Sequence, residues 1–354
     1  MSRFFSAKYA ALAPYTPGEQ PKDQQYIKLN TNESPFPPSP RAQQYAAEAA
    51  KHLQLYSDPE CTALREKIAQ LYAVSPDEVI ATNGSDEILN FAFMAFADAD
   101  HPAVFPDITY GFYPVFAQLN GIAYREIPLK DDYTIDPADY VAHRGLVVIA
   151  NPNAPTGIAL GLNAIEQIVA DNPEAVVVID EAYIDFGGES AVSLIRKYDN
   201  LLVTQTFSKS RSMAGARLGF GIGCRELIRD LNTIRYSTNP YNVNRITMAA
   251  GIGALEDEAY TLVNCQTIMK NREWTACELA KLGYEFLPSQ TNFLFVKHPK
   301  LSGLETYQNL RKSGILVRHF AKPRLDDYNR ITIGTMDQMR AVVAALAKEA
   351  EAAQ

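Results

Sequence analysis

Three short apolar segments stand out along the chain, at residues 146–150, 176–179 and 201–206. Each is rich in residues that favour strands and lacks alternation with polar residues, which is typical of strands buried on both faces of a parallel sheet. The stretch 162–171, between the first two segments, is long enough for a crossover helix. The pattern therefore predicts βαβ units and an α/β fold with a mainly parallel sheet flanked by helices.

Further elements are predicted around these strands. The alternating glycines of residues 219–223 indicate a tightly packed strand rather than a dinucleotide loop, because Cys224 stands where the third glycine of that fingerprint belongs. Helices are predicted at 42–55, 61–72 and 88–96, with a short strand at 79–82. After about residue 240 a smaller α/β domain is predicted, with helical residues 245–282 broken near 256–257, strands at 292–296, 315–318 and 330–333, and helices at 304–312 and 336–353.

The first 40 residues are irregular, because seven prolines between Pro14 and Pro40 exclude a continuous helix. Aromatic and aliphatic residues such as Tyr15 and Phe36 give this segment side chains to pack with, so we expect an ordered arm over the body rather than a disordered tail. The predicted organisation is an arm at 1–40, a large domain at 41–240 and a small domain at 241–354.

Composition narrows the function classes. The chain has 33 basic and 41 acidic residues, a net charge of −8, which argues against a nucleic-acid binder. The longest apolar runs are far shorter than the roughly 20 residues that span a bilayer, and residues 1–8 lack the apolar run of a signal peptide. The four cysteines and five histidines have no metal-ligand spacing. We therefore expect a cytoplasmic protein with free thiols, no metal site, no membrane segment and no nucleic-acid partner.

Chemically active residues follow each of the three strand segments. Asn-Pro-Asn-Ala-Pro-Thr-Gly spans 151–157, Asp-Glu-Ala-Tyr spans 180–183, and Phe-Ser-Lys-Ser-Arg spans 207–211. Ligands of open α/β sheets bind at the carboxyl ends of strands, so these groups should share one crevice. There Lys209 would act as an amine nucleophile and Asp180 would hold a proton on a ring nitrogen.

The remaining polar groups fit a phosphorylated aromatic ligand. Arg217 offers a fork for phosphate, and the turn 83–86 opens a helix whose free N–H groups and dipole favour an anion. Tyr183 could reach a phenolic oxygen on the ring, and Tyr110 could supply an aromatic face. A pyridine ring with a phenolate, an aldehyde and a phosphate satisfies all of these groups, so we predict pyridoxal 5'-phosphate as the cofactor.

Motifs 151–157, 180–183 and 208–219 resemble those of the fold-type I, class I and II pyridoxal-phosphate aminotransferases. Within them the chain is most similar to the histidinol-phosphate aminotransferases, on motifs 29–35, 56–59, 83–87 and 330–335. The resemblance covers nearly the whole chain. It implies a homodimer with shared active sites that moves an amino group between an amino donor and a keto acid, here glutamate or 2-oxoglutarate and an imidazole phosphate.

Two alternatives stay open within this resemblance. Another class I or II aminotransferase of amino acids or phosphorylated amines, or a lyase like threonine-phosphate decarboxylase, would carry the same cofactor motifs. A regulatory protein that senses an amine would normally need an appended DNA-binding domain, for which the predicted elements leave no room.

The resemblance also implies roles for individual residues. Lys209 would attach the cofactor and move a proton, with Asp180 on the ring nitrogen and Tyr183 on the phenolic oxygen. The cofactor would further be bound by Ser85, Asp86, Tyr110, Ser208 and Arg217, and by Tyr56 of the other subunit. The substrate would be bound by Arg330 at its α-carboxylate, by Tyr15 and Arg318 near its phosphate, and by the nearby Asn32.

One position departs from the family pattern. An Asn that binds the cofactor's phenolic oxygen usually precedes Pro-Thr-Gly, and here that residue is Ala154. Either Asn153 takes over this contact through a shifted turn, or Tyr183 makes it alone.

Overall fold

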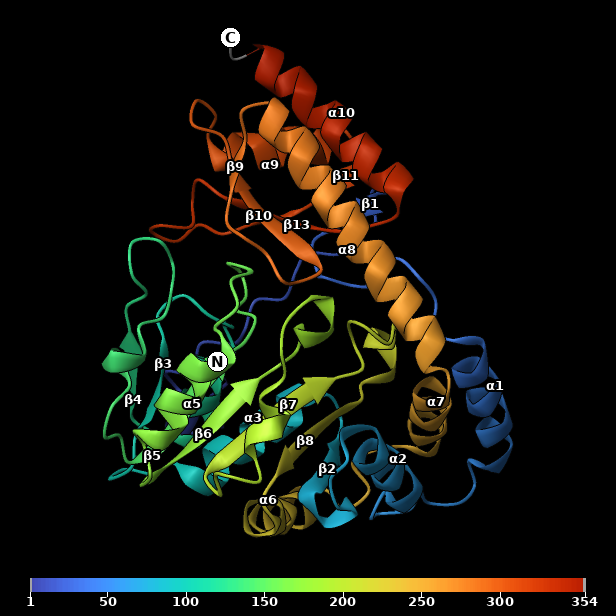
Figure 1. Cartoon of the computed structure of the whole chain (residues 1–354), viewed down its shortest axis with the longest axis vertical. Helices are drawn as coiled ribbons and strands as arrows, with labels where there is room; N and C mark the ends of the chain where they lie inside the picture. Colours follow the sequence, from blue (N-terminus) through green and yellow to red (C-terminus); the bar gives the residue numbers. More distant parts are fainter. Residues whose placement is uncertain (1, 353–354) are drawn as a thin grey trace.

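A computed structural model describes residues 2–352 and places a seven-stranded sheet at the centre of the chain (Figure 1). In spatial order the strands are β2 (Val79–Thr82), β8 (Gly219–Gly223), β7 (Leu201–Thr206), β6 (Ala175–Asp180), β5 (Gly145–Ala150), β3 (Ala103–Pro106) and β4 (Tyr124–Ile127). Only β8 runs antiparallel to its neighbours, β2 and β7. The predicted mainly parallel sheet is confirmed.

The central strands are buried on both faces because successive side chains enter two different cores. On β5, Val147 and Ile149 join one core, whereas Leu146 and Val148 join the core on the opposite face. Alternation between apolar and polar residues is absent because both faces lie under helices. The first core is covered by α2 (Thr62–Tyr72), α5 (Leu162–Ala170) and α7 (Arg245–Glu256), and the second by α3 (Ser85–Phe96), α4 (Tyr113–Asn120) and α6 (Arg225–Thr238).

A second, smaller layer lies at one end of the molecule (Figure 1). Its antiparallel sheet has the order β12 (Arg318–His319), β13 (Asn329–Thr332), β10 (Phe293–Lys297) and β9 (Glu285–Phe286). Three helices pack on it: α8 (Glu258–Lys281), α9 (Gly303–Lys312) and α10 (Met336–Ala352). The arm also enters this layer, because β1 (Ile27–Lys28) pairs in parallel with β11 (Ile315–Leu316).

Helix α7 packs differently from the domain organisation predicted from the sequence. It lies against α1 (Pro40–Ala49) and α2, and its Met248 and Ala254 belong to the core of the large layer. The small layer therefore begins with α8, and we propose a division near Asp257 in place of residue 241. Helical periodicity predicted the helix and its break correctly, but periodicity does not say which core a helix joins.

Short 3-10 helices complete the described elements. They are η1 (Ala7–Tyr9), η2 (Ala50–His52), η3 (Pro76–Glu78), η4 (Pro137–Asp139), η5 (Ile184–Phe186), η6 (Ala191–Leu194) and η7 (Ala214–Ala216). Among residues 2–352, no helix is both long and apolar enough to cross a bilayer.

Candidate functional site

A cavity of about 250 Å³ lies at the carboxyl ends of β5, β6 and β7. It brings together most of the residues predicted to bind the cofactor. Its walls include Ser85, Asp86, Tyr110, Asp180, Tyr183, Ser208, Lys209 and Arg217, as well as Thr31, Glu33 and Ala154. Groups separated by more than a hundred residues thus meet because the parallel strands end at one edge of the sheet.

Asp180 is the last residue of β6 and is buried at the floor of this cavity. The hydroxyl of Tyr113 donates to its Oδ2 at 2.9 Å, and Thr204 Oγ1 donates to its Oδ1 at 3.3 Å. Burial nevertheless prevails over these bonds and raises the pKa of Asp180 to about 6. The two hydroxyls carry no charge, so a protonated ring nitrogen would supply the cation that a buried carboxylate requires.

The phosphate end of the cavity is built where α3 begins. Gly84 precedes the helix with φ +83°, and a Cβ there would lie 2.5 Å from Nη2 of Arg217. A Cβ on Gly219 would lie 2.4 Å from the backbone nitrogen of Ser85. Strand β8 can therefore approach the helix this closely only with glycine at position 219. Both glycines let a cationic side chain and a strand reach the N–H groups of the first helical turn.

Charges around this turn suit an anion. Arg217 pairs with Asp86, Nη2 to Oδ2 at 2.9 Å, and its Nη1 donates to Ser208 Oγ at 3.5 Å. Tyr110 Oη donates to the other oxygen of Asp86 at 2.8 Å. Arg217 and Tyr110 thus bind the Asp86 carboxylate. The Ser208 hydroxyl, the Arg217 guanidinium and the N-terminus of α3 lie together at this end of the cavity, where an anion could bind. These groups fit the phosphate of pyridoxal phosphate.

Lys209 lies between the arm and Tyr183. Its Nζ donates to Thr31 O at 3.3 Å and is 5.6 Å from the ring centroid of Tyr183. Asn32 Nδ2 donates to Tyr183 Oη at 2.9 Å, and its Oδ1 accepts a bond from Thr332 Oγ1 at 3.0 Å. Asn32, predicted to lie near the substrate, therefore contacts Tyr183 behind the cavity wall.

The predicted substrate-binding arginines lie toward the small layer and the arm. The guanidinium of Arg330 lies over the rings of Phe293 and Phe320, 5.3 and 5.6 Å from their centroids. Its Nη2 donates to Asn30 O at 3.1 Å, while its buried Nε has no acceptor among the described residues. Burial lowers the pKa of Arg330. A partly buried guanidinium with a free donor is suited to a carboxylate ligand.

Tyr15 and Arg318 lie beside one another at the same end. Tyr15 stacks on Phe112 with ring centroids 4.3 Å apart, and burial raises its pKa although Arg330 and Arg318 oppose the shift. Arg318 donates from Nη1 and Nη2 to the carbonyls of Pro17 and Thr16, each at 3.3 Å. The arm thus brings an aromatic hydroxyl next to two guanidinium groups.

Two predicted cofactor residues lie away from the cavity of this chain. Asn153 Nδ2 donates to Ile108 O and Thr156 Oγ1, both at 3.0 Å, and its Oδ1 accepts from Thr109 Oγ1 at 2.9 Å. Its amide is committed to shaping the turn, and Ala154 rather than Asn153 lines the cavity. The structure thus does not bring Asn153 into position to replace the missing Asn.

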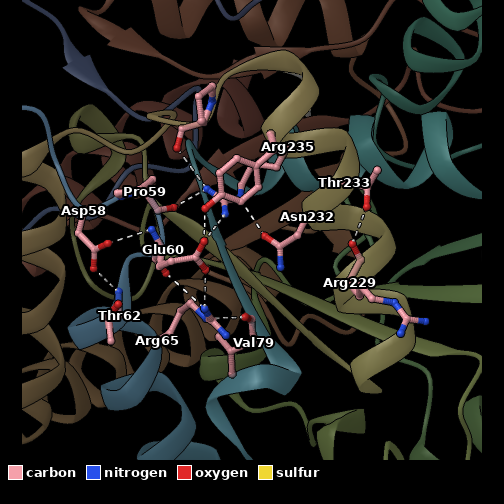
Figure 2. Close-up of polar contacts among 12 residues, drawn as sticks. Asp58, Pro59, Glu60, Thr62, Arg65, Val79, Arg229, Asn232, Thr233 and Arg235 are labelled. Carbon is pink, nitrogen blue, oxygen red and sulfur yellow. Dashed lines mark hydrogen bonds and ion pairs between the residues drawn. The ribbon is translucent and has the colours of Figure 1, made fainter.

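Tyr56 is the other predicted cofactor residue outside the cavity. It is 79% exposed, on the loop between α1 and α2, and stacks on Tyr241 with ring centroids 4.5 Å apart. The backbone of this loop is held by the polar contacts drawn in Figure 2. Its role in a partner's site stays a prediction.

Sequence patterns alone did not identify several residues of the site. Tyr113 and Thr204 bind Asp180, but they come from α4 and from within β7, and no local pattern marks them. Thr31 and Glu33 line the cavity, and their place in motif 29–35 was the signal that could have pointed to them.

The family "Aminotransferase class I and II" matches residues 24–346 of the chain. Curated relatives include histidinol-phosphate aminotransferase 2 of Dechloromonas aromatica, 49% identical over 98% of this chain and 99% of the relative. Histidinol-phosphate aminotransferase 1 of Bradyrhizobium diazoefficiens is also 49% identical, over 96% of this chain and 97% of the relative.

Solved structures agree with the fold. Histidinol-phosphate aminotransferase from Sinorhizobium meliloti, in complex with pyridoxal-5'-phosphate, has a TM-score of 0.85 at 25% identity, covering 93% of this chain and 92% of that one. A second neighbour, a putative histidinol-phosphate aminotransferase from Erwinia carotovora atroseptica, has a TM-score of 0.85 at 26% identity over 92% and 96% of the two chains.

Proposed function

Because this chain belongs to the class I and II aminotransferase family, we propose that it transfers an amino group between glutamate and a phosphorylated imidazole substrate, histidinol phosphate, in histidine biosynthesis. Pyridoxal 5'-phosphate is its cofactor. The observation that carries the proposal is the single cavity in which buried Asp180, Lys209 and the N-terminus of α3 meet. The four cysteines of the described chain are free thiols, which supports a reducing cytoplasm.

The residues of this chain divide the work around the cofactor. When bound, pyridoxal phosphate provides an electron sink for charge that develops at the substrate's α-carbon. Asp180 would hold the proton on the ring nitrogen, and Tyr183, whose hydroxyl accepts a hydrogen bond from Asn32, would donate its own proton to the phenolic oxygen. Lys209 Nζ would hold the cofactor covalently until the substrate's amine displaces it, and the freed lysine amine would then take up the proton of the substrate's α-carbon and return it.

The substrate is held by groups toward the arm and the small layer. Arg330, with its free Nε, binds the α-carboxylate of glutamate. Arg318 and Tyr15 bind the phosphate of histidinol phosphate. Glu33 lines the cavity, and hydrogen bonds from Lys28 and Thr31 lower its pKa although burial opposes them. Its ionised carboxylate can accept an imidazole N–H.

A homodimer with shared active sites is part of the proposal. Tyr56 cannot serve the cavity of its own chain while it stacks outward on Tyr241, and it would reach the cofactor phosphate of the partner subunit. Leu53 and Leu55, more than half exposed beside it, are apolar surface that a second copy would cover.

The test is an assay of the purified holoenzyme with histidinol phosphate and 2-oxoglutarate, against other phosphorylated amines, aromatic amino acids and threonine phosphate. We expect glutamate to form fastest from histidinol phosphate, and the Lys209→Ala variant to be inactive. Release of carbon dioxide from threonine phosphate without glutamate formation would instead identify a lyase.

A further inference from the structure

The exposed pair of Tyr56 and Tyr241 stands on a backbone that is held from below. Ser57 Oγ donates to Val243 O at 2.8 Å, and Arg245 Nη2 donates to Tyr56 O at 2.6 Å. Asp58 accepts the backbone N–H of Thr62 at 2.8 Å, which ties the loop to the first turn of α2. These bonds hold the backbone of the loop in one position, which a tyrosine that enters a partner's site would require.

Arg235 occupies the centre of this support (Figure 2). It lies in the last turn of α6 and is only 2% exposed. Its Nη1 donates to Pro59 O at 2.5 Å and to Pro240 O at 3.3 Å. Pro59 follows Tyr56 by three residues and Pro240 directly precedes Tyr241. One guanidinium therefore fixes both segments that carry the stacked rings.

Hydrogen bonds of 2.5–3.3 Å hold Arg235 more closely than its ion pair with Glu60 does. Buried arginines are usually paired closely with carboxylates, but Glu60 Oε1 lies 3.9 Å from Arg235 Nη2. Glu60 is instead engaged by Arg65 Nη1 at 3.2 Å and by the hydroxyl of Tyr236. Arg235 Nε donates to Asn232 Oδ1 at 2.8 Å, which sets the plane of the guanidinium. Its donors are thus directed at loop carbonyls.

Arg65 anchors the same loop to the sheet. Its Nε donates to Val79 O at 3.0 Å, at the start of β2, while its Nη1 binds Glu60. Strand β2 leads directly into Gly84 and the helix N-terminus that forms the anion site. Arg65 therefore binds the loop that carries Tyr56 to the central sheet.

We propose that Arg235 is a positioning residue for the active site of the partner subunit, because it fixes the Tyr56–Tyr241 pair in the orientation in which Tyr56 reaches the partner's cofactor phosphate. This inference rests on the shared site of the proposed function. A hydroxyl at the end of a tyrosine ring moves far when its loop tilts, and binding constellations tolerate only about 0.5 Å of displacement.

Hybrid dimers separate this role from ordinary stabilisation. A chain with Lys209→Ala still provides Tyr56, and a chain with Tyr56→Ala still provides Lys209, so the hybrid has one complete site. Two differently tagged chains are co-expressed and purified for both tags. The readout is the amount of cofactor fixed to Lys209 by borohydride at increasing pyridoxal phosphate, which reports the complete site alone because the hybrid contains one Lys209.

Arg235→Met is then placed on one chain or the other. On the Lys209→Ala chain it loosens the Tyr56 that enters the complete site, and the apparent dissociation constant for the cofactor should rise by about ten-fold or more. On the Tyr56→Ala chain it lies beside the incomplete site, and the constant should stay that of the parent hybrid. Arg229→Met, on the same helix with its guanidinium pointing away from the loop (Figure 2), is the matched control on the first chain.

The outcomes test the positioning role of Arg235 and the shared active site separately. Equal losses from Arg235→Met on either chain would overturn the positioning role in favour of a general effect on folding, and no loss from either would overturn it outright. If the parent hybrid binds the cofactor no more tightly than a Tyr56→Ala homodimer, the shared site of the proposed function is contradicted. The role of Arg235 is then contradicted as well.

Discussion

At the scale of single residues, Asp180 has an unusual environment for a carboxyl group. It is buried beneath two neutral hydroxyls, and its pKa is raised from 3.8 to about 6. A carboxylate in this setting is poised to accept a cation from a ligand, and a bound ring N–H would restore the charged form. The same shift makes the stability of the cofactor-free protein depend on pH.

The sign of that dependence follows from the raised pKa. The folded state binds the proton of Asp180 more tightly than the unfolded state, so its contribution is present below pH 4 and is lost as the pH rises through 6. The shift of about two units corresponds to at most about 3 kcal/mol. We expect cofactor-free wild type to lose stability relative to Asp180→Asn across this range in urea unfolding. Parallel stability curves for the two proteins would contradict the raised pKa.

Each of the two arginines at the substrate end should contribute more to one half-reaction than to the other. Arg330→Lys loses the bidentate contact with a carboxylate, so it should slow the glutamate half-reaction more than the histidinol-phosphate half-reaction, by about ten-fold or more. Arg318→Ala should do the reverse. Stopped-flow absorbance of the bound cofactor measures each half-reaction separately. Equal losses with both substrates in both variants would show that these side chains do not share the work as proposed.

At the scale of elements, the close packing of β8 on the N-terminus of α3 shapes the anion site. A methyl group on Gly219 would meet backbone atoms of Gly84 and Ser85, which cannot swing aside. Gly219→Ala should therefore destabilise the protein by about 1–3 kcal/mol and weaken cofactor retention, because the helix N-terminus must shift.

A matched glycine provides the control for this prediction. Gly161, at the start of α5, has no heavy atom within 4 Å of an added Cβ among the described residues, so Gly161→Ala should leave cofactor retention unchanged. Retention is measured as cofactor remaining after gel filtration. Full retention by Gly219→Ala would mean that the anion site does not depend on this close approach.

Elements with a clear local pattern could be predicted from the sequence. Strand β7 begins and ends at the predicted residues, and the predicted break near 256–257 separates α7 from α8. Residues 103–127, which form β3, α4 and β4, were missed, as was α6. The exposed positions of β4 do not resemble those of a buried strand, since β4 lies at the sheet edge.

Some residues of the site could likewise be predicted from the sequence, and others could not. Residues directly after strands, such as Asp180 and Lys209, could be predicted because strand ends converge in an α/β sheet. Tyr113 could not, because its contact with Asp180 depends on where α4 docks. The choice between Asn153 and Tyr183 also required coordinates, since it depends on the direction of one amide in a turn.

At the scale of the whole molecule, the exposed apolar side chains around Tyr56 predict a dimer. Leu53 and Leu55 are 58% and 59% exposed and adjoin the loop that would enter the partner's site. Replacing both with Asp should place charges in the covered surface and shift the sedimentation coefficient from dimer toward monomer, with loss of cofactor affinity. A wild-type monomer with full activity would contradict the shared site.

The proposed active site depends most on Lys209, at the carboxyl end of β7. The most direct measurement is borohydride reduction of the holoenzyme, followed by peptide mapping by mass spectrometry. We predict that the reduced cofactor is found on Lys209 and on no other lysine, and that Lys209→Ala takes up none. Labelling of a different lysine in the folded wild type would contradict the assignment of this cavity as the active site.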